Sequence, residues 1–297
     1  MMNIVQNQIL ANLTSWKVGG PARYFCQPEN YKDISEAVEF AEKNNLKIVI
    51  LGGGSNVLVS DKGISGVVLH LGKLNQMTVK EENGNLKISA QAGVPKSELG
   101  RAFLKKKLAP AVFLAGLPGD IGGGIVMNAG VSDATVPKEF VEITEWVEIY
   151  RFDQKKFITM SADDLAWSYR KCSGWQPGII VQAGFQWKLG ESPDIVETVF
   201  AANRLRVGKQ PLNLPSCGSV FKNPTGDKAG RLIDSCGLKG FQVGKAQVSP
   251  KHANFIVNLG GATASDIDQV IRYVKKTVME KTKVELEAEV VYLGNWD

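Results

Sequence analysis

The chain has 297 residues, of which 44% are hydrophobic, and its 35 Lys and Arg against 30 Asp and Glu give a net charge of +5. At about 150 residues per domain this length predicts two domains, and the composition excludes a disordered or fibrous protein. The densest basic run, residues 105–107, is short and lacks interleaved aromatic residues, so we expect no nucleic-acid partner. A moderately basic enzyme for an anionic small molecule fits this charge equally well.

Targeting and metal signals are also missing from the sequence. The first residues lack a basic region followed by an apolar run, so we expect a cytoplasmic protein. The most apolar stretch, 108–131, carries Pro110, Pro118, Asp120 and six glycines between 116 and 130, which excludes a stable membrane span and predicts a loop system. Four cysteines without a CxxC pair and only two histidines predict no metal site. Proton chemistry therefore falls on Ser, Tyr, Lys, Asp or Glu.

The first glycine cluster lies between two predicted strands. A helix is expected from Asp33, its cap, because the apolar residues Ile34, Ala37, Val38 and Ala41 follow a helical spacing. A strand over 47–51 runs directly into Gly52, Gly53 and Gly54, and 57–61 is again strand-like. A Rossmann loop requires a helix at that point, so this interpretation fails. What remains is a turn whose backbone amides can bind an anion.

A second glycine cluster follows further along the chain. Strands are expected over 66–71 and 86–92 and a helix over 96–107, after which 116–124 contains five glycines without a helical pattern. Such density implies close approach to a ligand or to another backbone segment. Two clusters at strand ends predict one extended ligand with a pyrophosphate between them, while the alternative is that the glycines only form tight turns.

The remainder predicts strands over 143–152 and 179–187, a helix over 199–207 and a domain boundary near 190–193. Thr263 or Ser265 is expected to cap a helix that ends at 280–282, and 284–290 reads as a strand of period two with Glu285, Glu287 and Glu289 on its polar face. Segment 215–224 suits either a ligand-facing loop or a polar surface turn. His252 precedes an apolar stretch, and it has either a ligand-facing role or a purely structural one.

Six segments in this order and spacing carry a resemblance: Leu-Gly-Gly-Gly-Ser-Asn at 51–56, Gly-Leu-Pro-Gly at 116–119 with Gly122 and Gly123, Ser-Tyr-Arg at 168–170, Gly-Ser-Val-Phe-Lys-Asn-Pro at 218–224, Lys-His-Ala-Asn-Phe-Ile-Val-Asn at 251–258 and Leu-Glu-Ala-Glu-Val at 286–290. Together they resemble the UDP-N-acetylenolpyruvoylglucosamine reductase family, in its shorter branch, over nearly the whole chain. The resemblance implies an α+β protein with an FAD-binding domain of the vanillyl-alcohol-oxidase (PCMH) type over 1–192. That domain has subdomains of about 1–70 and 71–192, and a smaller α+β substrate domain occupies 193–297.

The activity implied is that of an FAD-containing, NADPH-dependent oxidoreductase, a UDP-N-acetylmuramate dehydrogenase. It reduces the enolpyruvyl group of UDP-N-acetylenolpyruvoylglucosamine to give UDP-N-acetylmuramate for peptidoglycan, cell shape and cell division. FAD is expected to be non-covalent, because neither glycine loop contains His or Cys. The substrate and NADPH are the only partners expected, with no membrane and no obligate protein partner. The alternatives are an oxidase or dehydrogenase of the same fold acting on a sugar or hydroxy acid, and a non-catalytic binding module.

Residue roles follow from the same resemblance. Arg170 would bind the substrate carboxylate, Ser219 would protonate the neighbouring carbon, and Glu289, with a raised pKa, would support the enolic intermediate. Asn223 and Lys209 would bind the substrate diphosphate, and Lys222 would assist Ser219 and the substrate. The expected cofactor-binding residues are Gly52, Gly53, Gly54, Ser55, Asn56, Gly116, Pro118, Gly119, Gly122, Gly123, Asn128 and Tyr169.

Two departures from the family pattern affect these expectations. Val131, Ser132 and Asp133 stand where the family usually has Ala-Tyr-Gly, which puts contacts from that loop in doubt. Cys217 replaces a small apolar residue and is expected either as an oxidisable thiol near the cleft or, more simply, as a buried small side chain. The long Tyr-bearing loop of another family branch is not apparent.

Overall fold

The computed structural model describes residues 2–131, 135–190 and 194–296. Its contacts divide the chain into two compact units, each built from segments that are far apart in the sequence. Unit 1 comprises 1–3, 26–53 and 69–206, and unit 2 comprises 4–25, 54–68 and 207–297. The domain boundary expected near 190–193 falls largely outside the described residues, so the division at 192 stays a prediction.

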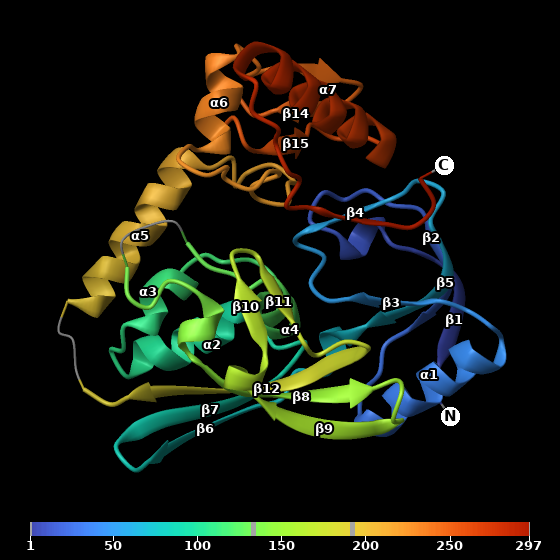
Figure 1. Ribbon diagram of the computed structural model, residues 1–297, viewed down its shortest axis with the longest axis vertical. Helices are drawn as coiled ribbons and strands as arrows, with labels where there is room; N and C mark the ends of the chain where they lie inside the picture. The colour runs from blue at the N-terminus through green and yellow to red at the C-terminus, as the bar shows by residue number, and fades with distance from the viewer. Residues whose placement is uncertain (1, 132–134, 191–193, 297) are drawn as a thin grey trace. The chain divides into compact units, whose positions relative to one another are not determined.

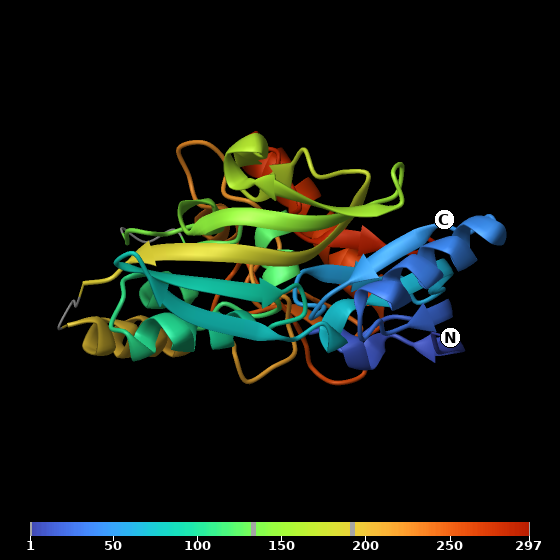
Figure 2. The same cartoon turned by 90° about the horizontal axis from the view of Figure 1, so that it is seen from below.

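Unit 1 is built on a five-stranded antiparallel sheet (Figures 1 and 2). Its order is β6 (Met77–Glu82), β7 (Asn85–Gln91), β12 (Gly178–Lys188), β8 (Thr144–Arg151) and β9 (Lys156–Ser161). The expected strands at 86–92, 143–152 and 179–187 are thereby confirmed. The long central strand β12 pairs with β7 on one side and β8 on the other, and its near-continuous burial matches its apolar sequence.

Three helices lie on one side of this sheet: α2 (Lys96–Lys105), α3 (Pro110–Leu114) and α4 (Ile121–Val126) (Figure 1). The helix at 96–107 is confirmed, but the prediction of a loop system throughout 108–131 is wrong. Helix α4 has the sequence Ile-Gly-Gly-Gly-Ile-Val, which disfavours helix on intrinsic propensity. Tertiary contact overrides propensity here, because the backbone at Gly122 lies against Ala92 and that at Gly124 against the Phe140 ring.

Helix α1 (Tyr31–Lys43) precedes β3 (Ile48–Leu51). Its buried residues are those expected from the spacing, but the expectation that Asp33 caps it is wrong: Asn30 is the cap, and its side chain accepts a hydrogen bond from the Asp33 backbone N–H. Tyr31 anchors α1 to the sheet, because its hydroxyl donates to the Glu148 carboxylate and lies 2.8 Å from Oε1 of Gln182. The Tyr31 ring also stacks on Phe157 at 4.5 Å between centroids.

Unit 1 also contains a small hairpin and most of a long helix. The hairpin β10 (Ala166–Ser168) and β11 (Lys171–Ser173) stands apart from the main sheet, and the helix expected at 199–207 is confirmed as part of α5 (Ile195–Lys209), whose residues to 206 belong to unit 1. Single 3₁₀ turns in the chain are Ala11–Leu13, Leu71–Lys73, Phe140–Glu142 and Ala162–Asp164.

Unit 2 combines N-terminal strands with the C-terminal third of the chain. Strands β1 (Ile4–Ile9), β2 (Pro21–Cys26) and β5 (Ile64–His70) are neighbours in that order, and β4 (Val57–Val59) pairs in parallel with β16 (Val291–Leu293). A three-stranded antiparallel sheet follows, made of β13 (Gln242–Val243), β14 (Ala246–Val248) and β15 (Ile256–Asn258). Helices α6 (Ala229–Ser235) and α7 (Ala264–Thr282) pack with this sheet around a second apolar core.

Helix α7 begins at one of the two expected caps. The Thr263 hydroxyl accepts from the Asp266 N–H, and the Asp266 carboxylate accepts from the Thr263 N–H, both at 3.0 Å, which forms a capping box. Ser265 instead binds Asp61, whose carboxylate accepts from the Ala264 and Ser265 backbone and from the Ser265 hydroxyl. The acidic side chain of a distant loop therefore also caps this helix.

The expected strand at 284–290 is wrong as a regular element. Only Ala288 forms an isolated bridge, with Phe221, and the regular strand begins at Val291. The alternation itself is real, because Leu286 and Val290 are buried while Glu285 and Glu287 are exposed. The segment forms too few backbone hydrogen bonds with other strands to be a regular strand. Its side chains nevertheless alternate between buried and exposed positions.

The Phe140 contact predicts opposite effects for two neighbouring glycines in α4. A Cβ on Gly124 would lie 2.6 Å from Cζ of Phe140, so Gly124→Ala is expected to lower the free energy of unfolding by ~1–3 kcal/mol. A Cβ on Gly123 meets nothing within 4 Å, so Gly123→Ala should raise it by ~0.5–1 kcal/mol through helix propensity. Urea unfolding without added flavin, followed by circular dichroism, measures both; equal shifts of the same sign would contradict the packing argument.

Candidate active site

The two glycine clusters meet in unit 1. A Cβ placed on Gly53 would lie 3.1 Å from Cα of Gly119 and 3.0 Å from Oδ1 of Asp120, although these residues are far apart in the sequence. The Asp120 carboxylate accepts a hydrogen bond from the Gly53 backbone N–H. Gly119 has φ +82°, a conformation that side chains rarely adopt. The prediction that glycine permits close backbone approach is confirmed.

The junction of the clusters leaves backbone exposed. Gly53, Gly116, Pro118 and Gly123 are all exposed, and a Cβ on Gly123 would meet nothing within 4 Å. Gly122 is different, since it is buried against Ala92 and serves packing. Gly123, which no side chain covers, offers exposed backbone of the kind to which an anionic group such as a diphosphate can bind.

The other residues expected in the first loop belong to unit 2. Gly54 has φ +62°, and a Cβ there would lie 2.0 Å from the Leu13 carbonyl oxygen, so the chain requires glycine at this position. Asn56 donates from Nδ2 to the Glu289 carbonyl oxygen at 3.0 Å. Ser55 is half-buried. Cofactor contacts for these three residues stay predictions.

Asn128 holds the second glycine segment to its surroundings. It is 1% exposed, with φ +37°, and its Nδ2 donates to Glu139 at 3.0 Å and to the Ser168 carbonyl at 3.2 Å. Its Oδ1 accepts from the Val141 N–H at 3.0 Å. These bonds make Asn128 a scaffold for the loop and for the β10–β11 hairpin, and its contact with a cofactor stays a prediction.

Tyr169 and Arg170 form the two-residue turn of that hairpin, between the paired residues Ser168 and Lys171. Arg170 has φ +58°, which is strained for a residue with a side chain and is typical of functional sites. Its guanidinium lies 4.8 Å from the Tyr169 ring centroid, and Nη2 donates to the Gly130 carbonyl at 3.0 Å. The hairpin tip therefore carries a cation to the end of the second glycine segment.

Two charged residues near the junction were missed by sequence reasoning. Lys96 is 5% exposed, and burial lowers its pKa to about 8, while Asp120 raises it and Arg170 lowers it further. Burial raises the pKa of Asp120 to about 6, against the opposing effects of Lys96 and the Gly53 N–H. The available signal was an acidic residue within a glycine-rich segment, together with a lysine that follows Pro95 at the start of a helix.

Unit 2 brings together Ser219 and Glu289. Glu289 N–H donates to the Val220 carbonyl at 2.8 Å, and Lys222 N–H donates to the Glu287 carbonyl at 2.9 Å, around the Phe221–Ala288 bridge. This register pairs Glu289 with Val220, the residue after Ser219, and Ser219 and Glu289 are both partly exposed. The Glu289 carboxylate also lies close enough to Cys217 to raise its pKa, after the larger effect of burial.

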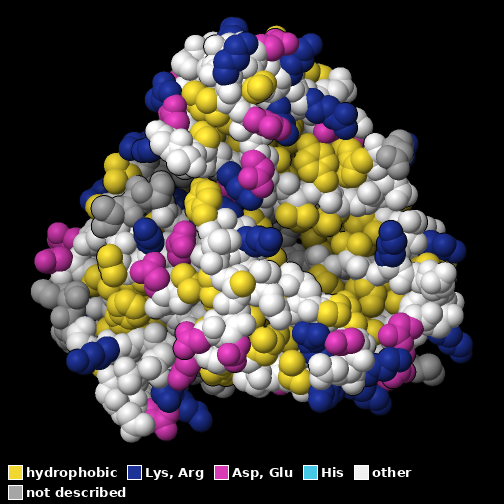
Figure 3. Space-filling model, viewed as in Figure 1, with side chains coloured by type: hydrophobic (Ala, Val, Ile, Leu, Met, Phe, Trp, Pro, Cys, Tyr) yellow, Lys and Arg dark blue, Asp and Glu magenta, His cyan; other side chains and the backbone are white. Residues whose placement is uncertain are grey.

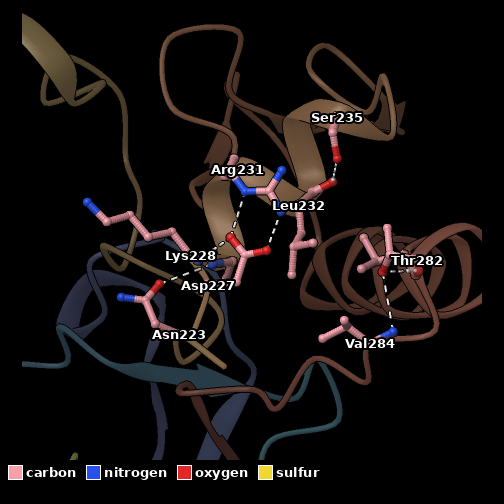
Figure 4. Close-up of polar contacts among 10 residues, drawn as sticks. Asn223, Asp227, Lys228, Arg231, Leu232, Ser235, Thr282 and Val284 are labelled. Atoms are coloured by element: carbon pink, nitrogen blue, oxygen red, sulfur yellow. Dashed lines mark hydrogen bonds and ion pairs between the residues drawn. The ribbon is translucent and has the colours of Figure 1, made fainter. Parts of the chain in front are cut away.

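Neighbouring polar residues in unit 2 already have protein partners. The Lys222 ammonium pairs with Glu287 at 2.6 Å. Asn223 Oδ1 accepts from the Ala229 N–H at 3.1 Å, and Figure 4 shows its side chain turned toward the start of α6, beside the Asp227–Arg231 ion pair. Lys209 is exposed at the end of α5. Substrate contacts for these three predicted residues stay predictions.

His252 has the structural role that the sequence left open. Its Nδ1 accepts from the Asn254 N–H at 3.3 Å, and its ring packs edge-on against Phe255. Burial lowers its pKa, so the ring is neutral at pH 7. Within the described residues, no group of three His, Cys, Asp or Glu side chains is placed to hold a metal ion.

Charges of both signs cover the visible surface. On the face in Figure 3, Lys and Arg side chains are interspersed with Asp and Glu. Across the part of the chain that the structure describes, no helix combines the length and apolar character needed to cross a bilayer.

Comparison with known proteins decides the family. A model described as an FAD binding domain matches residues 22–152, and one described as the UDP-N-acetylenolpyruvoylglucosamine reductase C-terminal domain matches 210–293. Reductases of this name from Synechococcus sp. and Clostridium tetani are 39% and 38% identical, each over 98% of this chain and over 94% and 92% of their own. The chain belongs to the UDP-N-acetylenolpyruvoylglucosamine reductase family.

A solved structure supports the same conclusion. The UDP-N-acetylenolpyruvylglucosamine reductase from Thermus caldophilus is 32% identical, covers 98% of both chains and superposes with a TM-score of 0.80. The expected fold, an FAD-binding α+β protein with a family-specific C-terminal part, is thereby confirmed. Of the family departures, Ser132 and Asp133 lie outside the described residues, while Cys217 is 5% exposed, as the buried small side chain that was expected.

Burial of the cysteines predicts slow thiol chemistry. All four are buried, and burial raises the pKa of Cys26 to about 12, of Cys172 to about 11 and of Cys217 well above its usual value. In native protein at pH 8, we expect each thiol to react with a disulfide reagent at least about a hundredfold more slowly than free cysteine. All four should react after unfolding in guanidinium. A rapid native reaction at Cys217 would revive the oxidisable-thiol alternative.

Proposed function

We propose that this chain catalyses the NADPH-dependent reduction of the enolpyruvyl group of UDP-N-acetylenolpyruvoylglucosamine to give UDP-N-acetylmuramate, with FAD as its non-covalent cofactor. The observation that carries the proposal is the similarity to reductases of this name over 98% of the chain. UDP-sugar and NADPH are the proposed partners. Because both are intracellular metabolites, the cytoplasm is the proposed compartment.

The residues of unit 1 fit an FAD site. The glycine junction exposes backbone at Gly53 and Gly123, which suits a diphosphate, and the FAD-binding family model spans both clusters. When bound, FAD supplies the hydride, received from NADPH, that reduces the substrate. The proposed division into an FAD domain over 1–192 and a substrate domain over 193–297 is supported by the two family models, which each fall within one of these ranges.

Arg170 is the proposed ligand of the substrate carboxylate. Addition of hydride to the terminal carbon moves negative charge toward that carboxylate. A guanidinium offers paired donors to a carboxylate and stays charged throughout. The contact with the Gly130 carbonyl and the packing on Tyr169 hold the Arg170 side chain in place before substrate arrives. Such preorganisation increases the stabilisation of the developing charge.

Ser219 is the proposed general acid, which donates its proton to the carbon next to the carboxylate. Its hydroxyl is partly exposed and it follows Gly218, whose φ of +82° shapes the turn. A hydroxyl is a weak acid at neutral pH, so a cation must stabilise the alkoxide that forms. Lys222 was one candidate, but it is paired with Glu287. Arg170 is the other candidate for this role.

Glu289 is proposed to support the enolic form of the substrate by hydrogen bonding or proton transfer. A carboxylate beside an enolate is repulsive, so the protonated acid is the form that would act. The backbone pairing of Glu289 with Val220, the residue after Ser219, supports this assignment. Glu285 and Glu287 point to solvent on the same face, which gives them no comparable role.

The alternative, an oxidase or dehydrogenase of the same fold, is distinguished by its substrates. It would reduce its flavin with a sugar or hydroxy acid, consume oxygen rapidly and need no NADPH. Relatives that match nearly the whole chain carry the reductase name, which favours the first proposal.

An anaerobic two-step titration tests the function and the role of Ser219. NADPH should bleach the flavin absorbance of wild-type protein, and UDP-N-acetylenolpyruvoylglucosamine should restore it. Ser219→Ala should bleach equally well, but turnover should fall by about a hundredfold to ten-thousandfold, the usual contribution of a general acid. Ser216→Ala, a loop serine nearby, is the matched control and should resemble wild type. Normal turnover by Ser219→Ala would refute the acid assignment, and bleaching without recovery in wild type would refute the substrate.

Two glutamates on the same extended segment separate catalysis from surface charge. Glu289→Gln should lower kcat by about tenfold or more, because the amide keeps the shape and a hydrogen-bond donor but cannot transfer a proton. Glu287→Gln removes only the ion pair with Lys222. Because the Glu287 side chain is 72% exposed, this variant should keep kcat within about twofold of wild type. Steady-state rates with both variants measure this; equal losses would remove Glu289 from the mechanism.

A further inference from the structure

The glycine junction contains a buried positive charge that the residues assigned above do not include. Lys96 is the first residue of α2, and its backbone N–H donates to the Gly119 carbonyl at 3.0 Å. Its side chain is 5% exposed. Burying an ammonium costs free energy unless other charges compensate it. The charges that act on Lys96 are those of Asp120, which attracts it, and Arg170, which repels it.

Asp120 places the compensating negative charge at the point where the loops meet. Its carboxylate accepts the Gly53 N–H and would lie 3.0 Å from a Cβ at Gly53 and 3.6 Å from one at Gly52. An isolated backbone bridge between Pro95 and Asp120 fixes this residue next to the start of α2. The chain therefore carries an acid on the backbone surface that is proposed to bind a diphosphate.

That arrangement is unfavourable unless the acid is neutralised. A carboxylate within several ångströms of a diphosphate repels it, and the repulsion is strong where side chains exclude water. The same carboxylate is nevertheless useful, because its hydrogen bond to Gly53 joins the two loops before any ligand binds. The Asp120 carboxylate therefore holds the two loops together but would weaken the binding of a diphosphate.

We propose that Lys96 is a positioning residue of the FAD site: its buried ammonium offsets the Asp120 carboxylate, which lets the carboxylate join the glycine loops without repelling the FAD diphosphate. This inference rests on the proposed function, because it takes the diphosphate to lie at the glycine junction. It assigns Lys96 and Asp120 as a charge couple, in which each residue is useful only while the other is present.

A double-mutant cycle on the affinity for FAD tests whether Lys96 acts through Asp120. Equilibrium dialysis of purified holoenzyme against buffers of decreasing FAD concentration measures Kd for wild type, Lys96→Met, Asp120→Asn and the double variant. Lys96→Met should bind FAD about tenfold more weakly or worse, because it leaves Asp120 unopposed. Asp120→Asn keeps an oxygen acceptor for the Gly53 N–H and should bind within about threefold of wild type. The double variant should recover to within about threefold of wild type.

Controls separate the couple from general effects of charge and folding. Lys105→Met removes the same charge from the exposed end of the same helix and should leave Kd within about twofold. Circular dichroism and thermal melting confirm that each variant is folded. If Lys96→Met does not fold, Lys96→Gln makes the same charge change with a polar side chain and carries the same expectation.

Two results would overturn the inference while leaving the proposed function intact. Wild-type affinity in Lys96→Met would show that the ammonium has no effect on FAD. A double variant as weak as Lys96→Met would show that Lys96 acts alone, by direct contact or by packing, and not through Asp120. Wild-type protein that takes up no FAD would refute the proposed function, and this inference with it.

Discussion

The approach of Gly53 to Gly119 and Asp120 is the contact on which the proposed FAD site depends. It joins the end of β3 to the segment that leads into α4, and glycine at 53 favours it, since a Cβ there would lie 3.1 Å from Cα of Gly119 and 3.0 Å from Oδ1 of Asp120, closer than ordinary contact. Hydrogen bonds hold the neighbouring segments in place. Lys96 is tied to Gly119, Arg170 to Gly130, and Asn128 to the hairpin that carries Arg170.

Side chains around the junction act mainly by holding backbone, and exposed backbone is the proposed binding surface. Asn128 uses all of its side-chain polar atoms on protein partners, and Asp120 uses its carboxylate on the Gly53 amide. In unit 2, two backbone hydrogen bonds set the register that pairs Glu289 with Val220, the residue after Ser219.

Much of this was predictable from sequence, for identifiable physical reasons. Strand β7 alternates apolar and polar residues, β12 is an apolar run, and helices α1 and α7 have apolar residues at helical spacing, and all four elements formed as expected. Failures occurred where tertiary contact overrides local preference: α4 is helical because Gly122 and Gly124 allow close packing on Ala92 and Phe140. Asn30 displaced Asp33 as a cap because cap choice depends on backbone geometry one turn earlier, which spacing does not reveal.

The site itself shows a different limit of sequence reasoning. Period two assigns Glu285, Glu287 and Glu289 to one face without ranking them. The structure separates them by their neighbours, because Glu287 pairs with Lys222, while Glu289 pairs through its backbone with Val220 and its carboxylate acts on Cys217. The sequence predicts Lys96 only as the first residue of a helix, and the Pro95–Asp120 bridge and the Gly119 contact that lie next to it come from a distant segment. Composition and spacing describe a residue's own element, whereas charge compensation is a property of pairs from distant segments. A buried lysine beside a glycine loop is therefore recognised only when the residue that faces it is known.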